Sequence, residues 1–360
     1  MNQTRIKRSI FLFVLFFVVL GLLIVYDVGA AQSLSLFNNK FSVVSQQCIR
    51  AIVGIVALLV ASKIPSKVWR TIGPFLFGLS LVLLCIVLLP HVSPPILGAK
   101  RWIGVGSLVF QPSELAKLGL IFYLSVWLQK PKLFRSFALL LTIVFGLVML
   151  EPDLGSGLVL SAIALSMYFV AGKPLKHLVW LFGAGAVGII LLILVSPYRF
   201  NRLTTFLNPD SDPQGKSYHI RQITIALGNG GVFGQGIGKS RQKYQYIPEA
   251  TTDSIFAIVA EEIGFIGCGM IIIGYITLYT QMNRFAVLLT DPTEALIATG
   301  IIAWLVSQTL VNLASIVALI PLTGVPLPFI SYGGSALITT LLAVGILLSL
   351  GKEKEIGRKR

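Results

Sequence analysis

Long apolar runs alternate with short polar loops along most of the chain. The runs are about 20 residues long, which is the length of a helix that crosses the hydrocarbon core of a bilayer. The pattern predicts an all-α polytopic membrane protein with ten transmembrane helices. The predicted spans cover residues 9–30, 43–61, 72–90, 110–128, 134–150, 153–172, 177–196, 254–280, 294–319 and 333–351.

One polar segment, residues 197–252, is much longer than the other loops and separates the seventh and eighth predicted spans. Long ordered loops of this kind are usually functional. Within it, Ile220, Ile223 and Leu227 fall on one helical face, which predicts a short helix on the membrane surface. We therefore interpret residues 1–360 as one membrane domain with this loop and with polar tails at 1–8 and 352–360.

Basic residues are concentrated in the two tails and in alternate loops. They are Arg5, Lys7, Arg8, Lys63, Lys67, Arg70, Lys130, Lys132, Arg135, Lys173, Lys176, Arg284, Lys352, Lys354, Arg358, Lys359 and Arg360. Loops rich in Lys and Arg stay in the cytoplasm. Both termini are therefore predicted to be cytoplasmic, and the 197–252 loop is predicted to be extracytoplasmic.

Composition supports the membrane class and excludes others. The chain is 55% hydrophobic and 12% charged, whereas a soluble domain is about 25% charged. A net charge of +15 would favour nucleic acid in a soluble protein, but here the basic loops explain it. No aromatic-basic platform for nucleic acid is seen, so no such partner is expected. No phosphate-binding loop of the G-x-x-x-x-G-K-[ST] type occurs either.

The few acidic residues gather on the predicted outer side. Four of the 14 Asp and Glu residues lie between Tyr246 and Gly264: Glu249, Asp253, Glu261 and Glu262. On its own, Asp253 at the start of the eighth span is typical of a helix N-cap. Glu261 and Glu262 lie about two turns further into that span, where buried acids need basic or polar partners.

Two further polar groups fall at or within predicted spans. Glu114 and Lys117 are three residues apart and share a helix face; they form either an internal ion pair or, with Arg101, a contact to an anionic ligand group. Gln308 and Asn312 make either helix–helix hydrogen bonds or the lining of a cavity. Asp153 is suited to the N-terminus of the sixth span.

The rest of the long loop holds two unusual stretches. Six glycines between 228 and 238 indicate either a hinge or a loop packed against a ligand or the outer leaflet. The run K-S-R-Q-K-Y-Q-Y (239–246) suits phospholipid headgroups or a pyrophosphate. His219 is interpreted as a surface histidine rather than a ligand. Further on, Pro321, Pro326 and Pro328 predict a non-helical path that must be buried or line a cavity.

With these motifs in order, the chain resembles the SEDS family of bacterial shape, elongation, division and sporulation proteins, the FtsW/RodA/SpoVE group. The matching motifs are A-K-R-W-I-G (99–104), F-Q-P-S-E-L-A-K (110–117), P-D-L-G (152–155), A-L-G-N-G-G-V-F-G-Q-G-I-G (226–238), P-E-A-T-T-D-S-I-F-A (248–257), A-E-E-I-G (260–264) and P-L-P-F-I-S-Y-G-G-S (326–335). The run 239–250 resembles the division branch, FtsW, more than the elongation branch, RodA.

The resemblance implies a peptidoglycan glycosyltransferase of the bacterial cytoplasmic membrane. Such enzymes polymerise lipid II, a disaccharide-pentapeptide on undecaprenyl pyrophosphate, on the outer side, for division or elongation. The implied partners are a class B penicillin-binding protein and other divisome or elongasome membrane proteins. The family's essential aspartate matches Asp253, and its conserved Glu and Lys match Glu114 and Lys117. The alternatives are a lipid II flippase and a non-catalytic scaffold for the penicillin-binding protein.

The sequence departs from the family pattern at two places. Thr251-Thr252-Asp253 stands where His-Thr-Asp is usual, and Glu151-Pro152-Asp153 stands where Gln-Pro-Asp is usual. The first departure puts in doubt any histidine beside the acid. The second adds a carboxylate.

The expected chemistry needs one base and several cations. Asp253 would remove the proton of an attacking sugar hydroxyl, and the cations would stabilise the leaving pyrophosphate. The candidate cations are Arg101, Lys117, Arg202 and Lys243. The sequence requires no cofactor. Mg²⁺ or Mn²⁺, held by acids such as Glu249, is expected to help stabilise the pyrophosphate charge. No set of metal ligands is identified.

Overall fold

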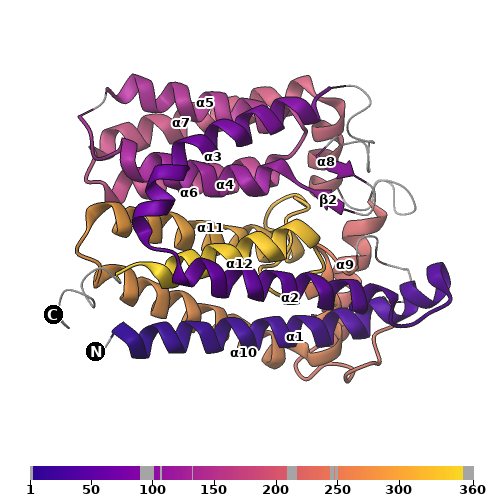
Figure 1. The fold of residues 1–360 in the computed structure, drawn as a ribbon. Helices are drawn as coiled ribbons and strands as arrows, with labels where there is room; N and C mark the ends of the chain where they lie inside the picture. Colours follow the sequence, from indigo (N-terminus) through magenta and orange to yellow (C-terminus); the bar gives the residue numbers. More distant parts are fainter. Residues whose placement is uncertain are drawn as a thin grey trace.

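The computed structural model describes residues 3–89, 101–105, 108–131, 133–208, 217–243, 247 and 250–351. Long helices lie side by side, and both ends of the described chain lie at one end of the bundle (Figure 1). We call it the terminal end and the opposite end the loop end. The helices are α1 (Gln3–Phe37), α2 (Ser42–Lys63), α3 (Ser66–Val87), α4 (Pro112–Trp127), α5 (Phe134–Leu150), α6 (Leu154–Val170), α7 (Leu175–Val195), α8 (Pro197–Leu207), α9 (Tyr218–Gly230), α10 (Ile255–Val287), α11 (Pro292–Ile316) and α12 (Gly334–Ser349).

Each predicted span coincides with a helix, α1 to α7 and α10 to α12. In the described chain, α1, α2, α3, α7, α10 and α11 are long and apolar enough to cross a bilayer, while α5, α6 and α12 are shorter apolar helices. The helical membrane class is therefore confirmed, and the count of ten crossings stays a prediction.

A small hairpin at the loop end was not predicted. β1 (Ile103–Val105) pairs antiparallel with β2 (Leu108–Phe110), and Ile103 lies opposite Phe110. Both strands are short and apolar with branched or aromatic side chains, which favour strands. The hairpin connects Arg101 to the start of α4, so it fixes where the Arg101 backbone lies.

Helix α10 is not a single straight helix. Its 33 residues would extend about 50 Å, well beyond the roughly 30 Å hydrocarbon core. The break is at Gly264, which has a φ of +67° and a ψ of −169°. This positive φ is accessible to glycine at little cost. The apolar run of the eighth span therefore contains two helical segments, 255–263 and 265–287.

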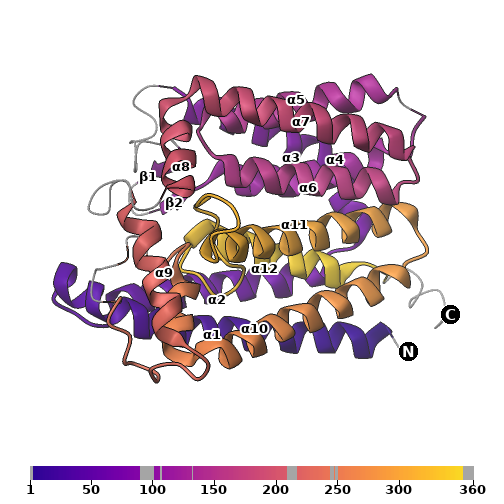
Figure 2. The ribbon, with the colours of Figure 1, turned by 180° about the vertical axis from the view of Figure 1, so that it is seen from behind.

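The first segment of α10 lies across the loop end of the bundle. Figure 2 shows α9 running across the direction of the long helices. Gly230 of α9 lies against Ala260, and a Cβ on Gly230 would come within 2.1 Å of the Ala260 carbonyl oxygen. At the other end of α9, His219 contacts Ser254. The segment 255–263 therefore runs alongside α9, and Glu261 and Glu262 do not lie deeper along a straight span as predicted.

The apolar face of α9 is also placed differently from the prediction. Ile220 and Ile223 are buried, and α9 packs on α10. The helix is transverse, as expected for a surface helix, but its apolar face meets protein instead of lipid. Leu227 is only partly buried.

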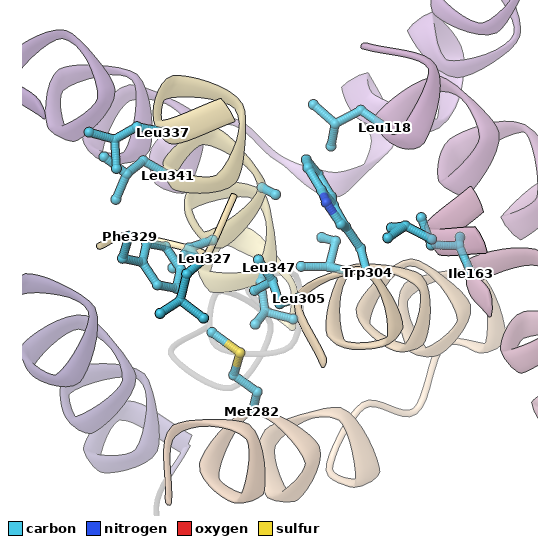
Figure 3. Packing of buried hydrophobic residues seen from close by; sticks show 14 of the residues in the cluster. Leu118, Ile163, Met282, Trp304, Leu305, Leu327, Phe329, Leu337, Leu341 and Leu347 are labelled. Carbon is cyan, nitrogen blue, oxygen red and sulfur yellow. The ribbon is translucent and has the colours of Figure 1, made fainter. Parts of the chain in front are cut away.

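The segment between α11 and α12, residues 317–333, is non-helical and enters the core. Its Leu327 and Phe329 are buried, and Figure 3 shows them among side chains of α11 and α12. Tyr275 of α10 donates a 2.5 Å hydrogen bond to the Pro328 carbonyl. The prediction that this proline-rich path is buried or lines a cavity is confirmed for residues 327–331, which are buried.

Candidate functional site

Two predicted site residues meet at Gly324 in the α11–α12 segment. A Cβ on Gly324 would lie 3.7 Å from Arg101 Nη1 and 3.8 Å from Asp253 Oδ2. Arg101 precedes β1 and Asp253 precedes α10, so the two residues come from distant parts of the chain. Position 324 has no side chain, so the guanidinium and the carboxylate both approach the backbone there.

The rest of the Arg101 guanidinium is fixed by the turn between α5 and α6. Its Nη2 donates to the Pro152 carbonyl, and its Nε donates to the Glu151 carbonyl at 3.4 Å. These contacts use part of the planar fork and hold its orientation. The remaining Nη1 faces Gly324 and Asp253.

Asp153 caps α6, as predicted. Its Oδ1 accepts a 3.1 Å hydrogen bond from the Ser156 backbone N–H, and its Oδ2 accepts one of 3.2 Å from Gln111 Nε2. The carboxylate is buried and satisfied by these donors. The helix cap predicted for Asp153 accounts for its contacts.

Glu151 is fully buried, and neither of its carboxyl oxygens has a hydrogen-bond partner among the described residues. Burial and the neighbouring Asp153 raise the pKa of Glu151 to about 9, against the opposing effect of Arg101. Glu151 is therefore a neutral acid at pH 7 and resembles glutamine in shape and charge. The departure from the family's Gln-Pro-Asp adds no negative charge near neutral pH.

The backbone around Asp253 is held from two directions. Asn312 Nδ2 of α11 donates 2.8 Å hydrogen bonds to the carbonyls of Asp253 and Val325. The Tyr332 N–H donates to the Thr251 carbonyl at 2.8 Å. Thr252 Oγ1 lies 3.3 Å from Asp253 Oδ1. The segment 251–253 is therefore fixed between α11 and the 317–333 segment.

The interpretation of His219 as a surface histidine holds only in part. The side chain is half-buried, and its Nε2 lies 2.8 Å from the Ser254 hydroxyl, next to Asp253. Burial and the charge of Arg202 lower the pKa of His219 to about 4, so the ring is neutral at pH 7. A signal was present in the sequence: His219 shares one helix face with Ile223, Ala226 and Gly230, which are buried.

Arg202 of α8 contacts the same region from another side. Its Nη1 donates a 2.6 Å hydrogen bond to the Leu322 carbonyl, two residues before Gly324. Arg202 is also close enough to His219 to lower its pKa. The structure therefore brings Arg101, Arg202 and His219 into the neighbourhood of Asp253.

Glu114 and Lys117 form the predicted internal ion pair. Their charged atoms are 2.7 Å apart, and each residue is only 1% exposed. Lys117 Nζ also donates to Gln308 Oε1 at 3.0 Å and lies 5.1 Å from the centre of the Trp304 ring. Thr339 donates to the second Glu114 oxygen at 3.2 Å. Contact of either residue with an anionic ligand stays a prediction.

The polar stripe on α11 connects this ion pair to the Asp253 region. Gln308 Nε2 donates to the Pro326 carbonyl at 3.0 Å, and Asn312 donates to Val325 and Asp253. Both amide nitrogens therefore bind the 317–333 backbone. Gln308 also makes one of the predicted helix–helix hydrogen bonds, because its Oε1 accepts from Lys117 of α4. Buried carbonyls in this non-helical segment gain the partners that they need.

Lys243 lies in an ion cluster that the sequence did not reveal. Its Nζ is 2.9 Å from Asp27 Oδ1 of α1 and 3.1 Å from Glu262 Oε1 of α10. Burial lowers the pKa of Lys243, but the two carboxylates outweigh this effect and raise it. The predicted contact of Lys243 with pyrophosphate stays a prediction. The carboxylates of Asp27 and Glu262 already balance the charge of Lys243. Glu261 accepts from Ser240 and Gln242, so both acids have partners as predicted.

Glu249 lies outside the described residues. Within the described chain, no three His, Cys, Asp or Glu side chains come together in a way that would hold a metal ion.

Comparisons with known proteins agree in sequence and in fold. Residues 7–356 match the family model of cell cycle proteins of the FtsW, RodA and SpoVE type. Stage V sporulation protein E of Bacillus subtilis is 39% identical, over 92% of this chain and 93% of that protein. A probable peptidoglycan glycosyltransferase FtsW of Coxiella burnetii is 38% identical, over 93% of each.

Solved structures show the same fold. A chain of a peptidoglycan synthase complex, described for its coordination of polymerization and crosslinking, is similar with a TM-score of 0.79. It is 29% identical and covers 96% of this chain and 97% of its own length. The Rod shape determining protein RodA of Thermus thermophilus has a TM-score of 0.69 at 30% identity, covering 94% of this chain and 95% of its own.

Proposed function

Because the chain belongs to the FtsW/RodA/SpoVE family of cell cycle proteins, we propose that it is a peptidoglycan glycosyltransferase that polymerises lipid II into glycan strands. Relatives named FtsW carry the name peptidoglycan glycosyltransferase, in agreement with the function predicted from the sequence. The FtsW-like prediction also agrees with the comparisons: stage V sporulation protein E and an FtsW relative are 39% and 38% identical, whereas RodA is 30% identical.

The proposed membrane arrangement has ten crossings, with one membrane domain and both termini in the cytoplasm. The loop end, which holds Asp253 and Arg101, then lies on the extracytoplasmic side. The distribution of Lys and Arg along the sequence supports this orientation. A substrate attached to the outer leaflet by its lipid would reach this end without crossing the bilayer.

The observation that carries the mechanism is the approach of Asp253 and Arg101 to one point beside Gly324. Asp253 takes the proton of the acceptor's GlcNAc 4-hydroxyl. That oxygen bonds to the anomeric carbon of the donor as the bond from this carbon to the diphosphate oxygen breaks. The electron pair leaves with undecaprenyl diphosphate, and the anomeric centre inverts. Since diphosphate is a good leaving group, one carboxylate base is sufficient.

Arg101 and Arg202 stabilise the charge on the leaving diphosphate. Arg101 is held by two carbonyls and directs its Nη1 to the site, so little reorganisation is needed. Arg202 is held at Leu322 in the same segment. Lys117 and Lys243 are weaker candidates because carboxylates pair with both.

A divalent cation is proposed as a helper only. The described residues bring no ligand cluster together, and Glu249, the predicted contributor, lies outside them. The steps above are therefore assigned to the chain's own residues. Dependence of the rate on Mg²⁺ or Mn²⁺ stays a prediction.

A class B penicillin-binding protein is the proposed partner, with other divisome or elongasome membrane proteins. The similar solved chain comes from a synthase complex that coordinates polymerization and crosslinking. A polymerase of this kind needs a crosslinking enzyme nearby, because the glycan strand that it releases is not joined to its neighbours.

The function is tested with purified full-length chain and labelled lipid II, in the presence of its crosslinking partner. Asp253→Asn keeps the shape of the side chain but removes the base, so polymer should fall by about 100-fold or more while lipid II binding is kept. The matched control is Asp291→Asn, which alters a carboxylate paired with Arg70 at the terminal end and should leave the rate unchanged.

Polymer made by Asp253→Asn at the wild-type rate would remove Asp253 from the mechanism. If wild-type chain scrambles lipid II across vesicles and makes no polymer, the flippase alternative replaces the proposal. If the wild-type chain neither scrambles lipid II nor makes polymer, the scaffold alternative replaces the proposal.

A further inference from the structure

The glycine-rich loop is built into the break of α10. The N–H groups of Gln235 and Gly236 donate to the carbonyls of Glu261 and Glu262, each at 2.9 Å. In return, Phe265 and Ile266 donate to the carbonyls of Gly231 and Val232. The loop therefore supplies the hydrogen bonds that the helix loses at Gly264.

This pairing leaves no room for side chains at the contact. A Cβ on Gly234 would lie 2.1 Å from the Glu262 carbonyl oxygen. The glycines therefore serve close packing of the loop on α10. A free hinge, one of the two predicted roles, does not fit these contacts. The loop's position relative to the start of the segment 265–287 is fixed.

The fixed loop presents large apolar side chains outward. Phe233 is 81% exposed and Ile237 80%, and Phe265, which follows the break in α10, is 78% exposed. Exposed apolar residues continue along α10 at Met270 and Ile273. In a helix that crosses a bilayer, this continuous face meets acyl chains, and the loop lies where the acyl chains give way to headgroups.

A polar cavity lies beside these side chains. It has a volume of about 260 Å³ and is lined by Asn229, Gln235, Lys239, Arg241 and Glu261. We call it the basic cavity. The charge of Glu261 is already engaged by hydrogen bonds from Ser240 and Gln242.

The two cations of the basic cavity have no acidic partner among the described residues. Both are exposed. The third cation of the same run, Lys243, is buried and paired with Asp27 and Glu262. The basic run 239–243 thus contains one structural cation, Lys243, and two cations that line the basic cavity.

We propose that the basic cavity binds the phosphate headgroup of an anionic membrane phospholipid. Lys239 and Arg241 would contact the phosphate, Asn229 and Gln235 would donate to headgroup oxygens, and Phe233 and Ile237 would lie among the acyl chains. Two cations that lack an acidic partner among the described residues, beside exposed apolar side chains, fit an amphiphile better than a free anion. This site does not depend on the glycosyltransferase proposal.

The test uses the purified full-length chain in neutral detergent, titrated with phosphatidylglycerol or phosphatidylcholine and followed by native mass spectrometry. The wild type should retain phosphatidylglycerol in preference to phosphatidylcholine. Lys239→Gln with Arg241→Gln should weaken phosphatidylglycerol binding roughly tenfold, and added salt should do the same. Inorganic pyrophosphate should not displace the lipid.

The matched control removes two other exposed cations at the loop end, by Lys40→Gln with Arg221→Gln. It changes the net charge equally and should bind as the wild type does. Equal loss in both double variants, or no loss in the first, would overturn the proposal. Displacement of phosphatidylglycerol by undecaprenyl diphosphate at lower concentration would also overturn it, because it would assign the cavity to a diphosphate.

Discussion

His219 Nε2 and the Ser254 hydroxyl are 2.8 Å apart, so a histidine from α9 contacts the residue that follows the proposed base. The family usually has a histidine two residues before that base, where this chain has Thr251. The long loop thus returns an imidazole to the same region from a different element. It also joins α9 to the start of α10.

We expect this contact to position Asp253. His219→Ala should lower the turnover number about tenfold, the effect of one lost hydrogen bond near the reaction, with KM for lipid II unchanged. His219→Gln should keep most activity, because its amide reaches the place of Nε2. Ser254→Ala should match His219→Ala, and the double variant should be no worse. Additive losses in that cycle would show that the two side chains act separately.

Arg101 is expected to act through its fixed geometry as well as its charge. Arg101→Lys keeps the charge but loses the planar fork that holds it to residues 151 and 152. The turnover number should fall by roughly 10- to 100-fold. Arg221→Lys, an exposed site on α9, is the control for a general Arg-to-Lys effect. A wild-type rate in Arg101→Lys would limit Arg101 to a charge role.

Glu151 predicts a specific pH dependence of stability. The folded protein holds the proton up to a pKa of about 9, whereas the unfolded chain releases it near 4.5. Stability should therefore decline as pH rises from about 5 to about 9. Glu151→Gln lacks this decline and should exceed the wild type by on the order of a few kcal/mol at the alkaline end. Thermal unfolding midpoints of both proteins across this range measure it, and parallel curves would contradict the assignment.

Variants of the Glu114–Lys117 pair can distinguish a role in stability from a role in ligand binding. Lys117→Met leaves a buried carboxylate unpaired and should cost about 3–5 kcal/mol, whereas Glu114→Gln with Lys117→Met should recover most of this. Arg70→Gln, at the partly exposed pair with Asp291, should cost about 1 kcal/mol or less.

The folded double variant then reports on function. Polymerisation at the wild-type rate would make the pair structural only, and a stable but inactive double variant would support the predicted ligand contact. Thermal unfolding measures the stability of each variant, and the labelled lipid II assay measures its polymerisation rate.

The helices were predictable because a helix that crosses the bilayer needs an apolar run of about 20 residues. The break in α10 was not, because the apolar pattern continues through Gly264 and a single glycine does not mark a turn. What makes the break stable is the backbone of residues 231–236, which the fold brings to it.

The site was predictable in part. The spacing of Glu114 and Lys117 on one helix was enough to predict their pairing. Asp27 and Lys243 are separated by 216 positions, and nothing local links them. Arg101 and Asp253 were singled out by charge and family resemblance, but their meeting at Gly324 depends on how the 317–333 segment is folded.

The transverse segment 255–263 has a consequence for how the enzyme fits membranes of different thickness. Hydrophobic mismatch is usually absorbed by helix tilt. In α10 such a tilt would act on the part after Gly264. Residues 251–254 stay attached to α9, to α11 and to the 317–333 segment. The height of the proposed base above the lipid surface is then independent of the length of the span that follows it, so one site geometry would serve bilayers of differing lipid composition.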